Sequence, residues 1–438
     1  MGVGFKVGGS AVFKSFVTVQ ANPSAVVTLT LGSLVYNVQA DSNGVASFTV
    51  KKKGTYTVTS NNTASYQAEN NTSTINVNKS NRSFTGQMVK LNIPAALSSG
   101  NYSSNVLSLY WTRPSSNWTG CDLRWHGTTY PTTRTAGTSL AKGAGGNLVL
   151  TSTSTVNGYN HTGLTANSTY YYSIFSYITI NGTDYWATAY RSTSGKAINY
   201  VGTVVTITST RTWAVPTGWR TAKVFVVGGG GGGAIGSGGG GAGGRTATSG
   251  NFNVTPGGTY VATIGGGGSA NGGSGGTTSF GSVASAAGGA GGNGLNGGSG
   301  GSGGGASGIY KGNSYDCDGS AGASNGGNAL SNGYVSGNSW HYYNGGTGQG
   351  TTTRAWGSSS GTLYSGGGGG GSRNRNYNGG SGGSGGGGAG SSSYTVAGTN
   401  GTANTGGGGG GGAYDSGSEA KSNGGSGGSG IILVQCVA

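Results

Sequence analysis

Residues 223–236, Lys-Val-Phe-Val-Val-Gly-Gly-Gly-Gly-Gly-Gly-Ala-Ile-Gly, decide the fold, because an apolar run leads directly into an unbroken block of glycines. Glycine blocks continue to residue 430, and 83 of the chain's 102 glycines lie after residue 200. This density is normally typical of a flexible linker, since glycine loses the most backbone entropy on folding. Apolar runs at 224–227 and 431–434 bracket the region, however, and aromatic residues punctuate it. These two features indicate an ordered structure.

Three ordered structures are rich in glycine, and the sequence favours one of them. Collagen needs a strict Gly-X-Y repeat with abundant proline, but the chain has six prolines and none lies in the long glycine runs. Calcium-binding β-helix repeats need an Asp in each glycine-rich nonapeptide, and the region holds only Asp316, Asp318 and Asp415. Polyglycine II remains, an extended left-handed helix with about three residues per turn that must hydrogen-bond to its neighbours. We therefore expect residues 228–430 to form such segments, packed side by side.

The strand-then-glycine pattern at 223–236 also resembles a dinucleotide-binding fingerprint. That fingerprint requires a helix after the glycines and an acidic residue about 20 positions later. A further glycine-rich stretch follows instead, which cannot start a helix, and the next acidic residue is Asp316. The sequence therefore argues against a nucleotide cofactor.

Titratable residues are few and dispersed. The chain has eight carboxylates, three histidines and three cysteines, whereas catalysis needs such groups gathered in a cleft. The tightest cluster, Asp316-Cys-Asp318, is typical of a polar loop, and His126 has too few possible ligands nearby for a metal site. We expect His126 and His161 in turns or at the surface. The sequence predicts no catalytic residues, no metal and no cofactor.

The charge pattern bears on partners and location. The net charge is +15, but the basic residues are scattered, whereas proteins that bind nucleic acid gather them on one face. The first ten residues lack a signal-peptide pattern, and no apolar run reaches the roughly 18 residues of a membrane helix. We therefore expect no nucleic-acid binding and no membrane insertion. A surface-type composition without an export signal fits a virus particle assembled inside its host.

The first 198 residues predict a short arm and two β-sandwiches. Residues 1–15 form the arm, and short alternating strands over 16–86 and 87–198 form the sandwiches. The turn at Asp41-Ser-Asn-Gly44 and the run ending at Thr59 resemble Ig-like modules of bacterial surface and phage proteins. In the second sandwich, Trp111 and the stretch from Gly163 to Tyr177 resemble the fibronectin type III pattern. Trp111 and one of the tyrosines should supply its core. The predicted fold class is all-β.

Residues 199–438 form the last predicted domain. Four motifs, at 213–233, 254–268, 277–281 and 427–438, resemble glycine-rich domains of phage tail fibres and adhesins. The resemblance implies a small β-scaffold closed by the domain's first and last strands, so that 431–434 pairs with the strands around Val204 and Val224. It also implies a polyglycine II sandwich whose intervening loops contact a bacterial receptor.

The inserts between glycine blocks are rich in aromatic side chains, amides and arginine. Large rigid rings give contact area at low entropic cost, which suits recognition loops. The predicted receptor-binding residues are Tyr334, Trp340, His341, Tyr342, Tyr343, Arg354, Trp356, Tyr364, Arg373, Arg375 and Tyr377. We expect the inserts at 334–343 and 354–377 to form the outward tip. The alternative is that these rings pack over the glycine segments as a lid.

The predicted function is that of a virion surface fibre or adhesin, exposed on the particle, that attaches to the host. Its predicted partners are other virion proteins, through residues 1–15, and a host surface glycan or outer protein. A homo-oligomer is compatible with this role. One alternative is a structural decoration of the capsid or tail with no receptor of its own. Another is a bacterial surface adhesin, against which the missing export signal counts.

Overall fold

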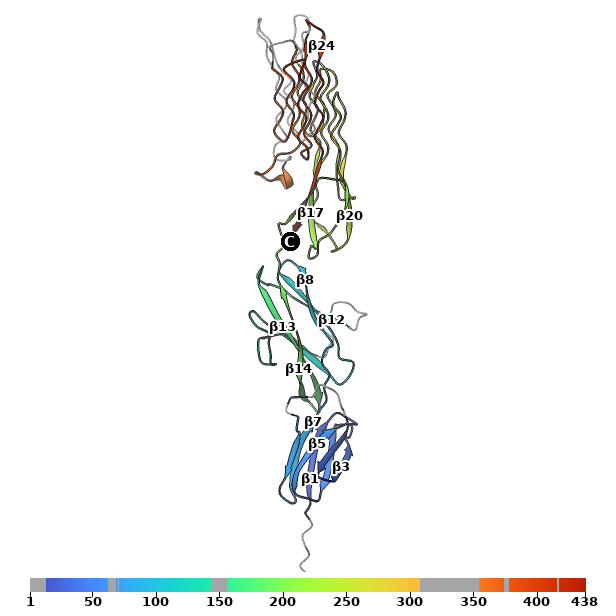
Figure 1. The fold of residues 1–438 in the computed structure, drawn as a ribbon, viewed down its shortest axis with the longest axis vertical. Coiled ribbons are helices and arrows are strands. Elements are labelled where there is room, and N and C mark those ends of the chain that lie inside the picture. The colour runs from blue at the N-terminus through green and yellow to red at the C-terminus, as the bar shows by residue number, and fades with distance from the viewer. Residues whose placement is uncertain are drawn as a thin grey trace, which may run out of the picture. The chain divides into compact units, whose positions relative to one another are not determined.

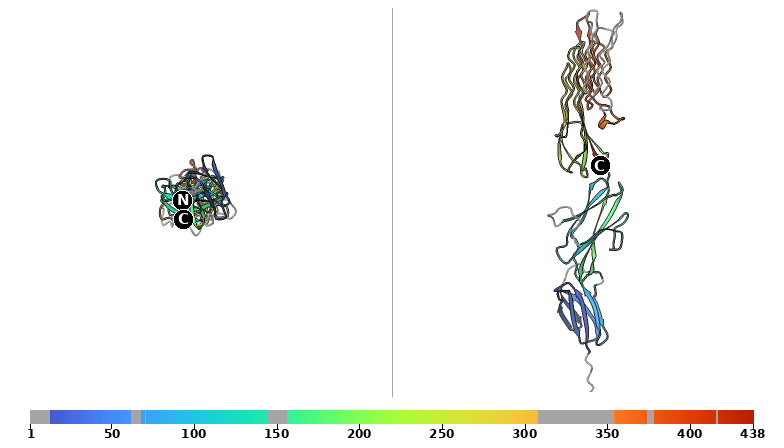
Figure 2. Two further views of the ribbon diagram at one scale, coloured as in Figure 1. Left: turned by 90° about the horizontal axis from the view of Figure 1, so that it is seen from below. Right: turned by 180° about the vertical axis from the view of Figure 1, so that it is seen from behind.

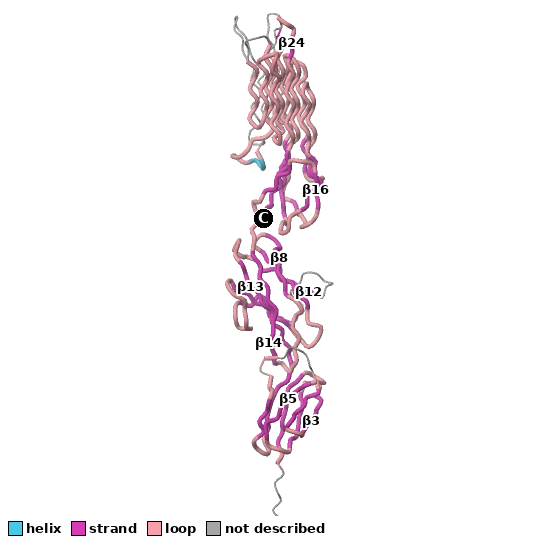
Figure 3. Tube along the Cα trace, in the orientation of Figure 1, coloured by secondary structure: helices cyan, strands magenta, loops and turns pink. Residues whose placement is uncertain are grey.

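The computed structural model describes residues 13–61, 68–69, 71–143, 156–307, 354–373, 378–415 and 417–438. The chain divides into two compact units, Met1–Asn199 and Tyr200–Ala438. Strands are the main regular elements of both units, although most of the described residues of the second unit lie outside strands and helices, and the helical element among the described residues is the 3-10 turn η2 (Ala355–Gly357) (Figures 1 and 3). The predicted all-β fold class is therefore confirmed. Residues 1–12 of the predicted arm, and the cluster at Asp316, Cys317 and Asp318, lie outside the described residues.

The first unit begins with a sandwich of two sheets. One sheet has the order β4-β1-β7 and the other β3-β2-β5-β6. The strands are β1 (Ser15–Ala21), β2 (Val26–Leu31), β3 (Leu34–Gln39), β4 (Val45–Val50), β5 (Gly54–Ser60), β6 (Thr74–Val77) and β7 (Ser83–Met88). Alternate residues of β1 and β4 face inward, as expected of half-buried strands, and the core includes Val19, Leu29 and Tyr56.

The turn between β3 and β4 is the predicted one. The Asp41 carboxylate accepts hydrogen bonds from the backbone N–H groups of Asn43 and Val45, both at 2.9 Å. Gly44 has a φ of +75°, and a Cβ there would lie 2.2 Å from the carbonyl oxygen of Ala21. The turn therefore needs glycine both for its conformation and for its close approach to β1.

A second sandwich completes the first unit. Its sheets have the orders β12-β9-β8 and β11-β10-β13-β14. The strands are β8 (Leu97–Ser103), β9 (Val106–Thr112), β10 (Gly120–His126), β11 (Thr138–Gly143), β12 (Val156–His161), β13 (Thr169–Ile180) and β14 (Thr183–Lys196). Trp111 and Tyr172 are both buried in its core with Leu109 and Ile174. The predicted core roles of Trp111 and of one tyrosine are confirmed.

His161 belongs to this core, so the prediction that it has a turn or surface role is wrong. β12 pairs with β9 and carries His161 opposite Leu107. Its Nδ1 lies 2.9 Å from the hydroxyl of Tyr172, and its ring centroid lies 4.8 Å from that of Trp125. Burial lowers the pKa of His161 to about 4, because an apolar site disfavours the charged imidazolium. His126, in contrast, is exposed at the end of β10, as expected.

The second unit has a small β-scaffold that joins its first and last strands. β25 (Ile431–Val437) lies between β15 (Val204–Ile207) and β17 (Thr221–Val227), with β18 (Thr246–Thr248) and β19 (Phe252–Asn253) beyond β17. Val434 is opposite both Val205 and Val224. The predicted pairing of 431–434 with the strands around Val204 and Val224 is confirmed.

A second scaffold sheet packs against the first. Its order is β16 (Arg211–Ala214), β20 (Thr259–Thr263), β21 (Thr278–Phe280) and β22 (Ala284–Ala286). Trp213, Trp219 and Phe280 fill the space between the sheets together with Val224 and Ile432. This aromatic cluster gives the scaffold the apolar core that the glycine-rich part of the unit cannot supply.

Outside the strands, the described glycine-rich stretches between 228 and 430 form extended segments, called here the glycine segments, that run side by side away from the scaffold (Figures 1 and 2). Successive N–H groups of the first segment, residues 228–234, point to three different neighbouring segments, and every third N–H group points to the same neighbour. They donate to carbonyl oxygens as follows, at 2.8–2.9 Å: Gly229 to Gly276, Gly230 to Gly428, Gly231 to Ala242, Gly232 to Gly273, Gly233 to Gly425 and Ala234 to Gly239. A β-strand would repeat every two residues, whereas a polyproline II-type helix repeats every three.

The same segment also accepts hydrogen bonds from three further segments. The carbonyl oxygens of Gly229, Gly230 and Gly231 accept from the N–H groups of residues 289, 268 and 409, respectively. The segment 228–234 therefore has six neighbours, all held by backbone hydrogen bonds. This arrangement is the predicted polyglycine II packing.

The close packing explains the glycine blocks. A Cβ at Gly231 would lie 2.1 Å from the Ala290 carbonyl oxygen, and one at Gly233 would lie 2.0 Å from that of Gly410. Real Cβ atoms essentially never approach another heavy atom within 3.0 Å. A side chain at either position would therefore force neighbouring segments apart and break their hydrogen bonds.

Candidate functional site

The glycine segments present mainly backbone and small side chains, so the large and charged side chains able to recognise a partner are concentrated in the loops at their two ends. We call the end next to β17 and β25 the scaffold end, and the opposite end, which carries the hairpin of β23 (Tyr414–Asp415) and β24 (Ala420–Lys421), the far end (Figure 1). Segments 228–234, 365–372 and 406–412 all lead from the scaffold end to the far end. There, Gly371 donates to the Gly238 carbonyl oxygen and Gly412 to that of Ala234.

Three residues form a row across the strands at the far end. Tyr414 pairs with Lys421 across the β23–β24 hairpin, and Arg373 pairs with Tyr414 through an isolated parallel bridge. The guanidinium carbon of Arg373 lies 5.5 Å from the Tyr414 ring centroid, and Lys421 Nζ lies 6.0 Å from it. Both distances allow a cation–π interaction. We call Arg373, Tyr414 and Lys421 the Arg–Tyr–Lys row.

Buried polar contacts fix the hairpin that carries this row. The Asp415 carboxylate is buried and accepts from the Ser418 hydroxyl at 2.5 Å and from the Gly417 N–H at 3.3 Å. The Ser422 hydroxyl accepts from the Ala413 N–H at 2.8 Å. Nearby, the amide oxygen of Asn271 accepts from the Gly424 N–H at 3.0 Å. The row therefore stands on a hydrogen-bonded base and not on a free loop.

Two apolar side chains are also exposed in far-end turns. Ile235, in the turn after the segment 228–234, is 49% exposed, and Val396, in the turn after Ser391, is 61% exposed. Neither contributes to an apolar core among the described residues. The far end therefore offers cationic, aromatic and aliphatic contacts together.

Tyr364 was predicted to contact a receptor, but its ring is buried at the scaffold end. It packs against Phe225 at a centroid distance of 5.5 Å, together with Val227, Ile431 and Leu433. Burial raises the pKa of its hydroxyl. Tyr364 therefore does pack against its own domain, but its ring covers the outer face of the β17–β25 pair and not, as the lid alternative expected, the glycine segments.

Arg354 and Trp356 also lie beside the scaffold. Trp356 packs at the edge of the same cluster, with Lys223 Nζ 5.1 Å from its ring centroid, and Arg354 Nε donates to the Gly361 carbonyl oxygen at 3.2 Å. The prediction that 354–377 as a whole forms the outward tip is wrong for 354–364. The reason is that segment 365–372 runs from the scaffold end to the far end, so its two ends lie at opposite ends of the glycine segments. Arg373 is the described residue of this set at the far end.

The other predicted receptor-binding residues lie outside the described residues and stay predictions. They are Tyr334, Trp340, His341, Tyr342, Tyr343, Arg375 and Tyr377. Sequence reasoning did not select Tyr414, Lys421, Ile235 or Val396. A usable signal was present for the first two, because Tyr414 and Lys421 stand on either side of an Asp-Ser-Gly turn in a short insert between glycine blocks.

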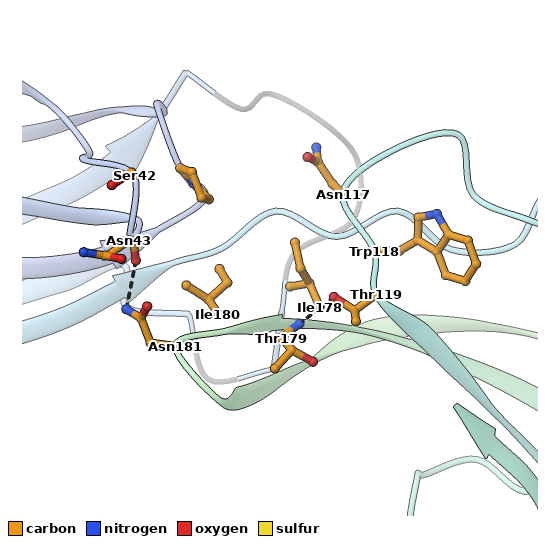
Figure 4. Close-up of a pocket in the computed structure, with 10 residues that line it drawn as sticks. Ser42, Asn43, Asn117, Trp118, Thr119, Ile178, Thr179, Ile180 and Asn181 are labelled. Atoms are coloured by element: carbon orange, nitrogen blue, oxygen red, sulfur yellow. Dashed lines mark hydrogen bonds between the residues drawn. The ribbon is translucent and has the colours of Figure 1, made fainter. Parts of the chain in front are cut away.

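The first unit contains a separate hollow between its two sandwiches, with a volume of about 350 Å³ (Figure 4). The Asn181 side-chain amide donates to the Asn43 carbonyl oxygen at 2.9 Å and links the turn after β13 to the turn before β4. The lining residues are Pro23, Ser42, Asn43, Asn117, Trp118, Thr119, Ile178, Thr179, Ile180 and Asn181. None of them titrates near neutral pH, so the hollow lacks the acid or base that general acid–base catalysis requires.

The described part of the chain contains no group of three His, Cys, Asp or Glu side chains placed to hold a metal ion. No helix in these residues is long and apolar enough to cross a membrane.

Comparison with known proteins defines the class of the second unit. The family described as "Glycine-rich domain" matches residues 204–437, which is more than half of the chain. The matched range begins at β15 and ends at β25, the two strands that close the scaffold. The chain therefore belongs to the glycine-rich domain family.

Several solved structures resemble part of the chain weakly. A DUF3823 family protein from Bacteroides ovatus shares 14% identity and covers 41% of this chain and 97% of its own, with a TM-score of 0.18. The FN1–FN3 domains of chicken CNTN1 share 11% identity over 41% of this chain and 57% of theirs, with a TM-score of 0.19. A putative carbohydrate binding protein from Bacteroides uniformis shares 10% identity over 42% of this chain and 98% of its own, with a TM-score of 0.17. No curated protein matches the chain.

Proposed function

We propose that this chain is a surface fibre or adhesin of a bacteriophage particle and that its far-end loops attach the particle to the host cell. The phage assignment rests on the resemblance of the four framing motifs to tail-fibre and adhesin domains. The attachment role rests on one observation: the Arg–Tyr–Lys row stands at the far end of a bundle whose segments are mostly glycine, with small side chains such as Ser274 and Ser381 between the glycines. Specific recognition by such a bundle has to come from its loops.

The physical reasoning concerns preorganisation. Each glycine segment is held by backbone hydrogen bonds to several neighbours, so the loops are mounted on a base that is already ordered before a ligand arrives. A side chain that is fixed in advance loses less conformational entropy on binding, which improves affinity. A rigid bundle with side chains at one end is therefore well suited to recognition.

The proposal extends to location and partners. The chain is exposed on the assembled particle, residues 1–15 contact other virion proteins, and the far end contacts a host surface glycan or an outer protein. No catalytic step is part of the proposal.

A competition experiment tests this function. Purified full-length chain is incubated with host cells before particles are added, and the unadsorbed particles are counted. We expect saturating chain to reduce adsorption strongly, because it occupies the receptor. Heat-unfolded chain at the same concentration is the control. If folded chain binds no host cells and leaves adsorption unchanged, a structural decoration of the particle replaces the adhesin.

A further inference from the structure

We propose that the Arg–Tyr–Lys row binds the anionic group, a phosphate or a carboxylate, of a charged saccharide on the host surface. This inference rests on the proposed attachment function and names the class of ligand for it.

The register of the strands places both cations beside one ring. Tyr414 is opposite Lys421 on one side and Arg373 on the other, so the three side chains occupy one line across three neighbouring chain segments. Directly opposed residues in paired strands have Cβ atoms about 5 Å apart. The two outer residues are therefore about 10 Å apart at the backbone, and their long side chains can converge on one bound anion.

The hydrogen-bond donors of both cations are available. Among the described residues, neither Arg373 nor Lys421 forms an ion pair or a side-chain hydrogen bond. Elsewhere in the chain such partners exist: Arg124 lies 2.8 Å from Asp122, and Arg134 lies 3.2 Å from Glu69. The far-end cations therefore keep their donors for a ligand.

The acidic residues nearby do not neutralise the row. Asp415 follows Tyr414 directly in β23, so its side chain points to the opposite face of the hairpin, where it is buried and accepts from Ser418 and Gly417. Glu419 lies in the exposed turn and forms no ion pair with Lys421. The face that carries the row keeps two positive charges.

Two like charges beside one ring repel each other, and a bound anion relieves this repulsion. The Arg guanidinium matches the two oxygens of a carboxylate or phosphate, whereas the Lys ammonium acts as a point charge. The ring quadrupole holds both cations in position. This combination selects an anion over a neutral group.

The surroundings of the row favour a saccharide as the carrier of the anion. The side-chain amide of Asn271 lies 3.2 Å from the amide oxygen of Asn423, and both are exposed at the same end of the bundle. Exposed amides, a phenol ring and two cations offer donors and acceptors for sugar hydroxyls together with the charge for a phosphate or carboxylate.

Matched pairs of sugars test the proposal. Mannose 6-phosphate and mannose, and galacturonate and galactose, are immobilised, and retention of the purified full-length chain is measured at fixed ionic strength. We expect retention on the charged member of at least one pair and none on its neutral partner. Lys421→Gln and Arg373→Gln should each weaken this binding about tenfold or more, because each removes a charge-assisted hydrogen bond.

Lys223→Gln is the matched control, since it removes the same charge from a cation beside an aromatic ring at the scaffold end. It should leave binding unchanged, and the melting temperatures of all three variants should match that of the wild type. Equal binding to charged and neutral sugars overturns the proposal, and so does an equal loss in Lys223→Gln. If inorganic phosphate competes as well as mannose 6-phosphate, the saccharide part is wrong. If the chain blocks particle adsorption yet binds none of these sugars, this inference fails and the proposed function stands.

Discussion

Substitution of a single glycine inside the bundle should destabilise it far more than most point changes do. Gly368 is a suitable position, because a Cβ there would lie 2.1 Å from the Gly409 carbonyl oxygen. Ordinary van der Waals contact begins near 3.4 Å, so the two segments would have to separate by more than 1 Å. Gly368→Ala tests this with one methyl group, and Gly368→Val tests it with a branched side chain.

The separation would break several hydrogen bonds at once. Gly368 donates to Gly241 and accepts from Gly305, while Gly409 accepts from Gly241 and donates to Gly231, at 2.8–2.9 Å. A buried group that is left without a partner costs about 1–3 kcal/mol. Loss of two or three of these bonds therefore predicts a destabilisation of roughly 3–6 kcal/mol for Gly368→Ala and more for Gly368→Val, against about 1 kcal/mol for a typical substitution.

Gly266→Ala is the matched control, because a Cβ there would have no heavy atom within 4 Å. It should be neutral, or stabilising by up to about 1 kcal/mol through the unfolded chain. Chemical unfolding of the full chain gives the free energies, and amide hydrogen exchange in residues 228–245 shows whether the loss is local to the bundle. If Gly368→Ala and Gly266→Ala have equal effects, the close packing described above does not limit stability.

Three further outcomes are expected. Removal of residues 431–438 should unfold the second unit, because β25 is the central partner of both β15 and β17, and calorimetry should show the loss of one transition. The second sandwich should lose up to about 3 kcal/mol of stability between pH 6.5 and 4, as measured by urea unfolding across this range. The folded-state pKa of His161 is lowered to about 4. The contribution of His161 to the free energy of unfolding is therefore complete above pH 6.5, and it falls at lower pH because the unfolded chain takes up the proton first. His161→Gln should flatten this pH dependence, and His126→Gln should not. Changing Trp340, Tyr342 and Tyr343 together to Ser should abolish particle adsorption without preventing assembly, and normal adsorption by such particles would favour the decoration alternative.

The scaffold could be predicted from sequence because its signals are local. The apolar runs at 224–227 and 431–434 are conspicuous beside so much glycine, so their pairing was a natural expectation. The glycine packing followed from composition, since blocks of glycine without proline or repeated Asp leave few ordered structures. The sandwich cores likewise followed from the alternation of apolar residues in short strands.

The arrangement of the loops could not be predicted in the same way. Glycine segments carry no side-chain pattern, so nothing in the sequence says which segment lies next to which. The pairing of Arg373 with Tyr414 therefore emerges only from the packed structure. The same is true of the separation between Tyr364 and Arg373, which depends on the length of the segment between them. His161 was missed because the residues before it, Asn157-Gly-Tyr-Asn160, do not read as a buried strand.

Stability and recognition depend on different atoms in the second unit. The glycine segments are held by backbone N–H and C=O groups, which every residue of a segment supplies whatever the loops contain. The recognition groups proposed here are side chains in the loops, and their own contacts are confined to short hairpins such as β23–β24. A loop substitution that spares buried polar anchors such as Asp415 and Ser422 should therefore alter binding with little effect on the bundle. The Lys421→Gln and Gly368→Ala variants are expected to separate these two properties, the first changing binding alone and the second changing stability.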